Sequence, residues 1–232
     1  MPPDNTTKQI RPDFSWNEID TVFLDLDGTL LDKYFDDYFW EEYVPEIYSK
    51  KNSIPIHLAK DKLLSTYKKV EDTLEWTDLD YWSQELSLDI PALKREVNHL
   101  VAIRPQVPEF LSFLEEMDKD IYLVTNAHPK TIDVKLDRVD IAQHFTTIFC
   151  SKDAGAAKEQ PEFWTQLEQS LSFSRSRTLF ADDTEKVLLS ARRYGLRHLL
   201  HIAKPSSKLP VSFSKTFPSI VNFDELMGDQ HR

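Results

Sequence analysis

Short apolar stretches alternate along this chain with segments in which apolar residues recur every three or four positions. The short stretches, rich in apolar and β-branched residues, predict buried strands at 21–26, 120–125, 146–151, 177–181 and 197–203. The segments with helical spacing predict helices at 108–117, 129–139, 160–171 and 184–194. Strands that alternate with helices favour an α/β fold, with a parallel sheet flanked by helices.

The segment after the first strand has a different pattern, with helical spacing alone. It predicts helices at 34–48, 56–73, 78–86 and 91–101, the first of them interrupted at Pro45. We therefore expect an α-helical insertion in the α/β unit. The predicted organisation is an N-terminal arm with the first core strand at 1–32, the helical insertion at 33–103, the α/β core at 104–209 and a C-terminal tail packing on the core at 210–232.

The charge of the chain argues against polyanionic partners. Its 232 residues include 28 basic and 39 acidic side chains, a formal net charge of −11. A phosphate backbone or an anionic membrane surface requires basic faces, so we expect no nucleic acid polymer and no membrane as partner. The single cysteine, Cys150, and the polar start of the chain favour a cytoplasmic protein.

Glycine is too scarce for the common nucleotide-binding loops. The four glycines are Gly28, Gly155, Gly195 and Gly228. Both G-x-G-x-x-G and the P-loop need clustered glycines so that the backbone can approach phosphates closely. Dinucleotide enzymes of the Rossmann type and P-loop kinases are therefore excluded.

Polar side chains follow the predicted strands at their carboxyl ends, where ligands bind in open α/β sheets. They are Asp25, Asp27 and Thr29, then Thr125 and Asn126, then Lys158, and finally Asp182 and Asp183. Four carboxylates in one place repel one another unless a cation neutralises them. Hard oxygen ligands suit Mg²⁺, so the sequence predicts a magnesium site beside a phosphate site.

The order and spacing of these residues resemble the four motifs of the haloacid dehalogenase superfamily. The motifs are Asp25-Leu-Asp-Gly-Thr, Thr125, Lys158 and Asp182-Asp183, and the resemblance spans residues 20–203. It implies a Rossmann-like parallel core, and the insertion resembles a type 1 helical cap. Segments such as TNAHP, VKL and TLFADDTE are similar to the bacterial GMP/IMP nucleotidase branch.

The resemblance also implies a role for each matched residue. Asp25 would be the nucleophile that forms an aspartyl-phosphate, and Asp27 the general acid and then the base. Lys158 would hold the nucleophile and the phosphate, and Thr125 and Asn126 would bind the transferred phosphoryl group. The metal ligands implied for Mg²⁺ are Asp25, Asp27 (through its backbone carbonyl), Asp183 and Asp182, the last either directly or through a water molecule.

These inferences predict a Mg²⁺-dependent phosphomonoester hydrolase, a purine 5′-nucleotidase acting on GMP or IMP as a monomer or homodimer. The alternatives are a phosphatase for phosphoglycolate or a sugar phosphate, and a phosphomutase similar to β-phosphoglucomutase. Dehalogenases lack a counterpart of Asp27 and the acidic cluster, so the sequence argues against dehalogenase chemistry. It also argues against a catalytically silent binding protein, which would not need these residues.

Several other residues have two interpretations in the sequence. Trp76, Tyr81 and Trp82 favour packing inside the insertion over stacking on a purine ring. His128 favours a solvated loop residue over a substrate contact, and Arg104 is interpreted as a structural residue where the insertion returns to the core.

Overall fold

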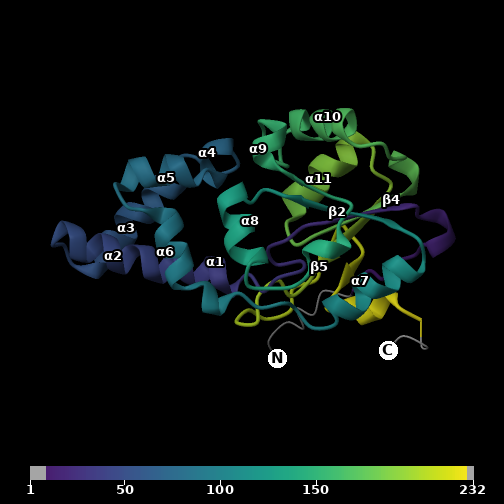
Figure 1. Ribbon diagram of the computed structural model, residues 1–232, viewed down its shortest axis with the longest axis horizontal. Coiled ribbons are helices and arrows are strands. Elements are labelled where there is room, and N and C mark those ends of the chain that lie inside the picture. Colours follow the sequence, from purple (N-terminus) through teal and green to yellow (C-terminus); the bar gives the residue numbers. More distant parts are fainter. Residues whose placement is uncertain (1–8, 229–232) are drawn as a thin grey trace, which may run out of the picture.

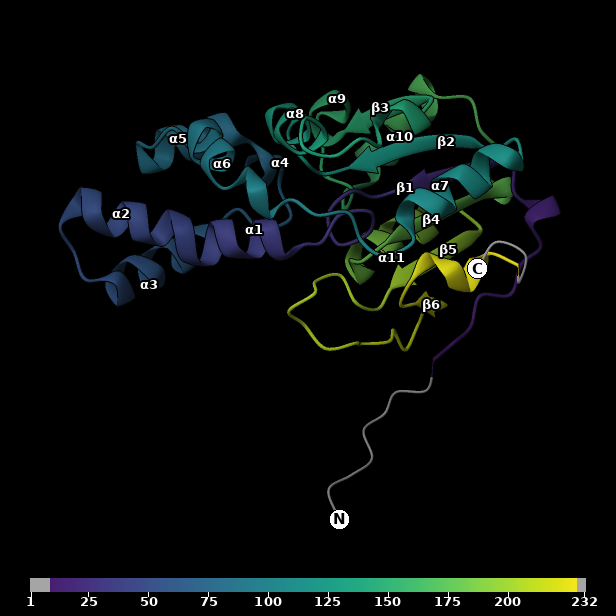
Figure 2. The ribbon, with the colours of Figure 1, turned by 60° about the horizontal axis from the view of Figure 1, so that its bottom comes forward.

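The computed structural model describes residues 9–228, so the first eight residues of the predicted arm and the last four of the predicted tail lie outside the described residues. Within the described residues, six parallel strands form one sheet in the order β3-β2-β1-β4-β5-β6 (Figures 1 and 2). The strands are β1 (Thr21–Leu24), β2 (Asp120–Thr125), β3 (Thr147–Cys150), β4 (Thr178–Asp182), β5 (His198–Ile202) and β6 (Ser219–Ile220). The predicted α/β class with a parallel sheet is confirmed.

Helices connect the strands and fill the insertion. The insertion contains α1 (Tyr34–Tyr38), η2 (Phe39–Tyr43), α2 (Val44–Asn52), α3 (Ile56–Tyr67), α4 (Leu74–Thr77), α5 (Leu79–Leu86), α6 (Ile90–Glu96) and η3 (Asn98–Leu100). The core contains α7 (Val107–Glu116), α8 (Pro129–Leu136), α9 (Ser151–Ala154), α10 (Pro161–Ser170) and α11 (Glu185–Tyr194), with short turns η1 (Trp16–Glu18), η4 (Ala142–His144), η5 (Arg175–Arg177) and η6 (Phe223–Leu226). Among the described residues, no helix combines the length and apolarity needed to cross a membrane.

The sheet is buried on both faces, which explains the continuous apolar stretch of β1. Successive side chains of a strand point to opposite faces. Leu24 packs in the cluster that contains Phe110 of α7, whereas Phe23 packs in the cluster that contains Trp164 of α10 and Leu188 of α11. In Figure 1, α10 and α11 accordingly lie on the opposite side of the strands from α7.

Helices α1–α6 lie together beside one end of the sheet (Figure 2). The chain leaves and re-enters the core side by side, because Leu31 forms a backbone bridge with Ile103. Arg104 is buried there and donates hydrogen bonds of 2.7 Å each to the carbonyls of Thr29 and Val221. The predicted structural role of Arg104 is confirmed, because its guanidinium joins the hinge to the C-terminal segment.

The expected break at Pro45 is wrong. The helix continues from α1 through the π-helical turn η2 into α2, and Pro45 lies near the start of α2. Proline lacks the N–H of a regular helix, and its ring clashes with the carbonyl one turn earlier. The wider π turn directly before Pro45 accommodates this mismatch, so the helix is modified locally and does not end.

Three further elements differ from the sequence prediction. The helix expected at 56–73 ends at Tyr67, and α4 follows as a separate turn. The strand expected at 146–151 ends at Cys150, because Ser151 begins α9. The C-terminal segment adds β6, which pairs with β5 through Ser219 beside His201. Elements of two to four residues are too short to show periodicity.

Candidate active site

The residues predicted from strand ends meet at the carboxyl edge of the sheet. Asp25 directly follows β1, and its backbone N–H donates to the carbonyl of Ala181 in β4. Asp182 ends β4 and Thr125 ends β2. These strands are neighbours of β1 in one parallel register, so their ends lie level with each other. The sheet topology therefore brings these three side chains to one site.

Lys158 lies at the centre of this group. Its ammonium is 2.5 Å from Asp25 Oδ1 and 2.7 Å from Asp182 Oδ2, and it donates to the carbonyl of Val124 at 3.3 Å. The side chain is 2% exposed, and those of Asp25 and Asp182 are also buried. Charge-assisted hydrogen bonds of this kind fix both partners. Lys158 therefore holds Asp25 in one orientation.

The group carries more negative charge than its one ammonium neutralises. Burial raises the pKa of Asp25 to about 7; Lys158 opposes this, and Asp182 and Asp183 add to it. Burial likewise raises the pKa of Asp182 to about 6. Burial disfavours the charge of Lys158, but the two aspartates outweigh it and raise the pKa of this lysine. A bound cation would relieve this excess.

The carboxylates fit such a cation. Among the described residues, Asp25, Asp182 and Asp183 each offer one oxygen, and these oxygens all lie within 4.8 Å of one another. Asp183 also accepts a hydrogen bond of 2.8 Å from Lys33, which is one third exposed. Hard oxygen donors at this density are compatible with Mg²⁺.

Gly28 lies directly against Asp183. Its φ of +85° is in the left-handed region that favours glycine. A Cβ atom at this position would lie 2.7 Å from Asp183 Oδ2 and 2.8 Å from Cβ of Pro205. The D-x-D-G-T turn therefore needs glycine both for its backbone conformation and for the space occupied by Asp183.

Asn126 is committed to the loop that carries Lys158. Its side-chain oxygen accepts from the backbone N–H of Lys158 at 2.8 Å, and its amide group donates to Glu159 at 2.9 Å. The backbone carbonyl of Asn126 accepts a hydrogen bond of 2.8 Å from the Ser151 hydroxyl. The structure thus places Asn126 at the site, with its side chain holding the Lys158 loop.

A second buried charge cluster, which the sequence did not predict, adjoins the first. Asp27 is not a member of the three-carboxylate group, and its Oδ1 lies 2.5 Å from the ammonium of Lys135 in α8. Lys135 also lies 2.5 Å from Asp36 of α1, which pairs at 2.8 Å with Lys94 of α6. Lys94 and Lys135 are both 1% exposed.

The second cluster also perturbs its members. Burial raises the pKa of Asp27 to about 6, in opposition to Lys135. For Asp36, burial acts in the same direction, but Lys135 and Lys94 outweigh it and lower the pKa. Helical spacing could have indicated that Lys135 is buried. It lies one turn after Thr131 and Ile132, on the buried face of α8.

A cavity of about 440 Å³ opens above both clusters and is lined from both sides. Its floor includes Asp25, Asp27, Thr125 and Lys158, and its outer wall includes Trp40, Leu64, Tyr67, Trp76 and Leu79 of the insertion. Trp82 is fully buried and forms edge-to-face pairs with Tyr67 and Trp76, so its predicted packing role is confirmed. Trp76 packs against this cluster and also lines the cavity, while Tyr81 packs against Trp82.

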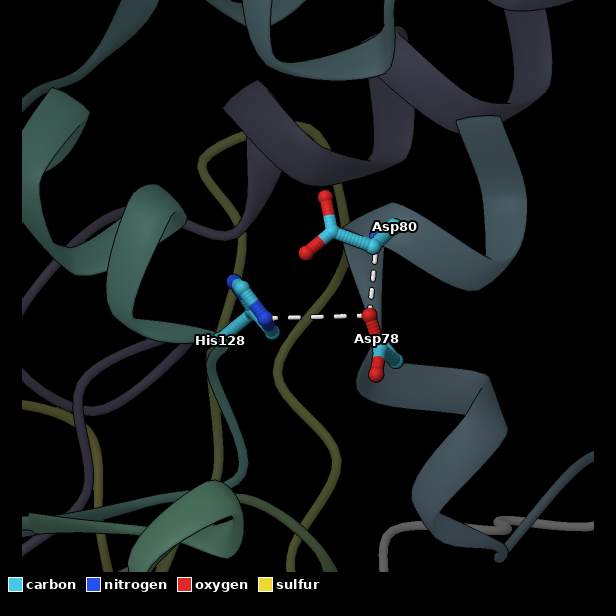
Figure 3. Close-up of side chains that lie close together, drawn as sticks. All are labelled: Asp78, Asp80 and His128. Atoms are coloured by element: carbon cyan, nitrogen blue, oxygen red, sulfur yellow. Dashed lines mark hydrogen bonds and ion pairs between the residues drawn. The ribbon is translucent and has the colours of Figure 1, made fainter. Parts of the chain in front are cut away.

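His128 is buried, so its interpretation as a solvated loop residue is wrong. Figure 3 shows it beside Asp78 and Asp80, at the contact between the insertion and the loop after β2. Its Nδ1 accepts from the backbone N–H of Lys130 at 3.3 Å and caps α8, while Nε2 lies 3.7 Å from Asp78 Oδ1. Burial lowers the pKa of His128.

This second group of possible ligands is a structural contact. A neutral imidazole that accepts at Nδ1 carries its proton on Nε2, which then cannot bind a metal. Asp78 caps α5 by accepting from two backbone N–H groups, and Lys152 lies 3.4 Å from its other oxygen. Asp80 pairs with Lys130. These interactions account for Asp78 and Asp80 through partners in the protein, whereas His128 Nε2 is buried without a hydrogen-bond partner in the described part of the chain.

The chain is similar to known hydrolases. A family model described as haloacid dehalogenase-like hydrolase matches residues 19–195. The GMP/IMP nucleotidase YrfG of Escherichia coli K12 is 35% identical over 213 residues, which are 92% of this chain and 96% of that protein. The pyrophosphatase PpaX of Oceanobacillus iheyensis is 24% identical over 180 residues, 75% of this chain and 79% of its own.

A solved structure shares the fold. The HAD phosphatase from Thermococcus onnurineus superposes with a TM-score of 0.73 at 20% identity, over 90% of this chain and 96% of that chain. At this identity the likeness concerns the fold alone, because one fold supports several chemistries.

Proposed function

This chain belongs to the haloacid dehalogenase-like hydrolase family, whose model covers more than half of it, and on that premise we propose that it hydrolyses the 5′-phosphate of GMP and IMP. The relative that is 35% identical over nearly the whole length of both chains is named as a GMP/IMP nucleotidase. The proposal extends that activity to this chain and assigns it to the site at the carboxyl edge of the sheet.

One observation carries the proposal: Asp25 is buried and held by Lys158 directly below the cavity. Lys158 binds Asp25 Oδ1 at 2.5 Å, which leaves Oδ2 as the oxygen that attacks phosphorus. Attack forms a bond between Asp25 and phosphorus and breaks the bond from phosphorus to the 5′-oxygen of the nucleoside. Carboxylates act as nucleophiles of this kind, and the product is an aspartyl-phosphate.

We assign the proton transfers to Asp27. The 5′-oxygen is a poor leaving group unless it receives a proton, and a carboxylic acid at the cavity wall can supply it. Burial keeps the pKa of Asp27 near 6, so a protonated fraction is present near neutral pH. Once deprotonated, the same carboxylate takes a proton from the water that hydrolyses the aspartyl-phosphate and returns Asp25 to its starting state.

The residues that would hold Mg²⁺ are Asp25, Asp182, Asp183 and the backbone carbonyl of Asp27. The bound ion supplies positive charge beside the transferring phosphoryl group. Lys158 contributes a further positive charge, and Thr125 is the hydroxyl donor assigned to the phosphoryl oxygens. Asn126 supports this arrangement through its hydrogen bond to the Lys158 loop.

We further propose that residues 33–103 act as a cap that selects the leaving group. Its aromatic wall, with Trp40, Tyr67 and Trp76, suits a flat purine ring. The cap also covers the reacting groups, and excluding bulk water strengthens the electrostatic interactions there.

Phosphate release from a panel of phosphomonoesters tests the proposal. The panel contains GMP, IMP, AMP, phosphoglycolate and sugar phosphates, each with Mg²⁺ and with a chelator. We expect the highest kcat/KM for GMP and IMP, and loss of turnover in chelator. Preference for phosphoglycolate or a sugar phosphate would overturn the nucleotidase assignment, and undiminished turnover in chelator would overturn the metal assignment.

Asp25→Asn tests the nucleophile. The amide of asparagine cannot form the aspartyl-phosphate, so we expect phosphate release to fall by more than about a thousandfold. Asp140→Asn is the matched control, because Asp140 is exposed. Near-normal turnover by a folded Asp25→Asn protein would refute the mechanism.

A further inference from the structure

Lys135 is one of the two fully buried lysines of the second charge cluster, and it has no role in the proposed chemistry so far. Its side chain is 1% exposed, yet its ammonium lies 2.5 Å from each of two carboxylates, Asp27 Oδ1 and Asp36 Oδ2. The ammonium also lies 5.3 Å from the centre of the Phe35 ring. A lysine buried to this degree needs such partners, because an unpaired buried charge is strongly unfavourable.

The four charged residues of the second cluster come from four different segments of the chain. Asp27 lies in the turn after β1, Asp36 in α1, Lys94 in α6 and Lys135 in α8. Asp36 is held from its other side by Lys94, whose ammonium lies 2.8 Å from Asp36 Oδ1 and 4.5 Å from the centre of the Phe39 ring. The orientation of Lys135 is therefore determined by Asp36 as well as by Asp27.

The cluster acts on one oxygen of Asp27 and leaves the other available. Lys135 binds Oδ1, and among the described residues no hydrogen bond reaches Oδ2. Asp27 lines the cavity, and its side chain is 24% exposed while that of Lys135 is closed off. The arrangement holds the carboxyl by one oxygen and leaves the other without a partner in the protein as described, in a side chain that lines the cavity.

We propose that Lys135 is a positioning residue for the proton transfer by Asp27, and that Asp36 holds Lys135 in place for this task. The inference rests on the proposed phosphomonoester hydrolysis. A general acid must lie within hydrogen-bond reach of the leaving oxygen, and a displacement of one ångström is costly. Without Lys135, the Asp27 carboxyl loses the contact that fixes its rotamer.

Substrates with different leaving groups distinguish this role from general support of the fold. The 5′-oxygen of GMP needs a proton as it leaves, whereas p-nitrophenolate leaves without one. A defect in proton donation therefore lowers kcat/KM for GMP more than for p-nitrophenyl phosphate. The parameter kcat/KM reports the steps up to leaving-group departure, so slower hydrolysis of the aspartyl-phosphate does not mask the difference.

The test variant is Lys135→Met, which keeps the apolar stem and removes the ammonium. We expect kcat/KM for GMP to fall by about 100-fold or more, within the usual range for general acid catalysis, and that for p-nitrophenyl phosphate to fall by less than about tenfold. Lys94→Met is the matched control, because Lys94 is equally buried and contacts Asp36 without contacting Asp27. We expect it to lower thermal stability and to leave the ratio of the two kcat/KM values as in the wild type.

Equal losses on both substrates, or no loss, overturn the positioning role while the wild-type activity still supports the proposed function. A wild-type protein that hydrolyses neither substrate overturns both proposals. If Lys135→Met does not fold, Asp36→Asn replaces it, since it removes the negative charge that anchors Lys135 from its other side at nearly unchanged side-chain volume. A wild-type ratio in a folded Asp36→Asn protein also overturns the inference.

Discussion

Replacing Gly28 with alanine is expected to destabilise the protein through two separate costs. The backbone φ of +85° disfavours any residue with a Cβ, by about 1–2 kcal/mol. The new methyl group would also lie 2.7 Å from Asp183 Oδ2 and 2.8 Å from Pro205 Cβ. Forcing apart atoms in a well-packed region costs about 1–3 kcal/mol more. The expected total is therefore about 2–5 kcal/mol.

The close contact with Asp183 gives the substitution a catalytic effect as well. For a chain of this size, each kcal/mol lowers the thermal midpoint by roughly 2–4 °C, so the expected shift is roughly 4–20 °C. Asp183 must turn away from the methyl group and from the other two carboxylates. Since Asp183 is one of the proposed metal ligands, we expect Mg²⁺-dependent phosphate release to fall at least about tenfold at temperatures where the variant is folded.

Gly195→Ala provides the matched control. Gly195 has φ +106°, and its nearest neighbours, atoms of Arg175, lie 3.8 Å away in ordinary contact. This variant should show the conformational cost alone, about 1–2 kcal/mol, with wild-type turnover. Thermal unfolding by circular dichroism and phosphate release well below both midpoints measure the two effects. The reasoning is refuted if Gly28→Ala matches Gly195→Ala in both midpoint and activity.

Three further predictions concern the metal, the hinge and pH. Saturating Mg²⁺, at about 100 times its dissociation constant, should stabilise the protein by about 2.7 kcal/mol in thermal unfolding; an equal shift in Asp183→Asn would contradict the ligand assignment. Arg104→Met should cost about 2–4 kcal/mol in denaturant unfolding, because two carbonyls lose a charged donor; a loss below about 1 kcal/mol would argue against this. Burial lowers the pKa of His128 below 6.5, so the unfolded chain binds a proton more readily and stability falls as pH drops through that value. His128→Gln should lose less stability between pH 7 and 5 than the wild type, and parallel losses would refute this.

The strand ends were predictable because the sheet is parallel. A buried parallel strand is a short apolar stretch, and its carboxyl end lies level with those of its neighbours. Asp25 and Asp182, which directly follow or end such stretches, were therefore expected to meet, and they share Lys158 in the structure.

The second charge cluster was not predictable in the same way. Apart from Asp27, its members come from helices of the insertion and of the core whose relative placement depends on tertiary packing, and only the positions of the lysines on buried helix faces gave a signal. Lys94 follows Leu93 in α6 and Lys135 follows Ile132 in α8, so each lysine occupies a position where an apolar residue is usual. A lysine at such a position indicates a buried carboxylate partner, but the sequence does not say which one.

The two clusters together change the electrostatic argument about phosphate binding. Ion pairs link four lysines to five aspartates around the cavity: Lys33, Lys94, Lys135 and Lys158 with Asp25, Asp27, Asp36, Asp182 and Asp183. Counted as fully ionised, this set carries one net negative charge, although the chain as a whole carries −11. A divalent cation held by three of these aspartates reverses the sign of the set. Because Asp37, Glu41, Glu71 and Glu159 also line the cavity, the ion is needed beside them to attract a phosphate dianion, and chelation is expected to weaken substrate binding as well as to slow turnover.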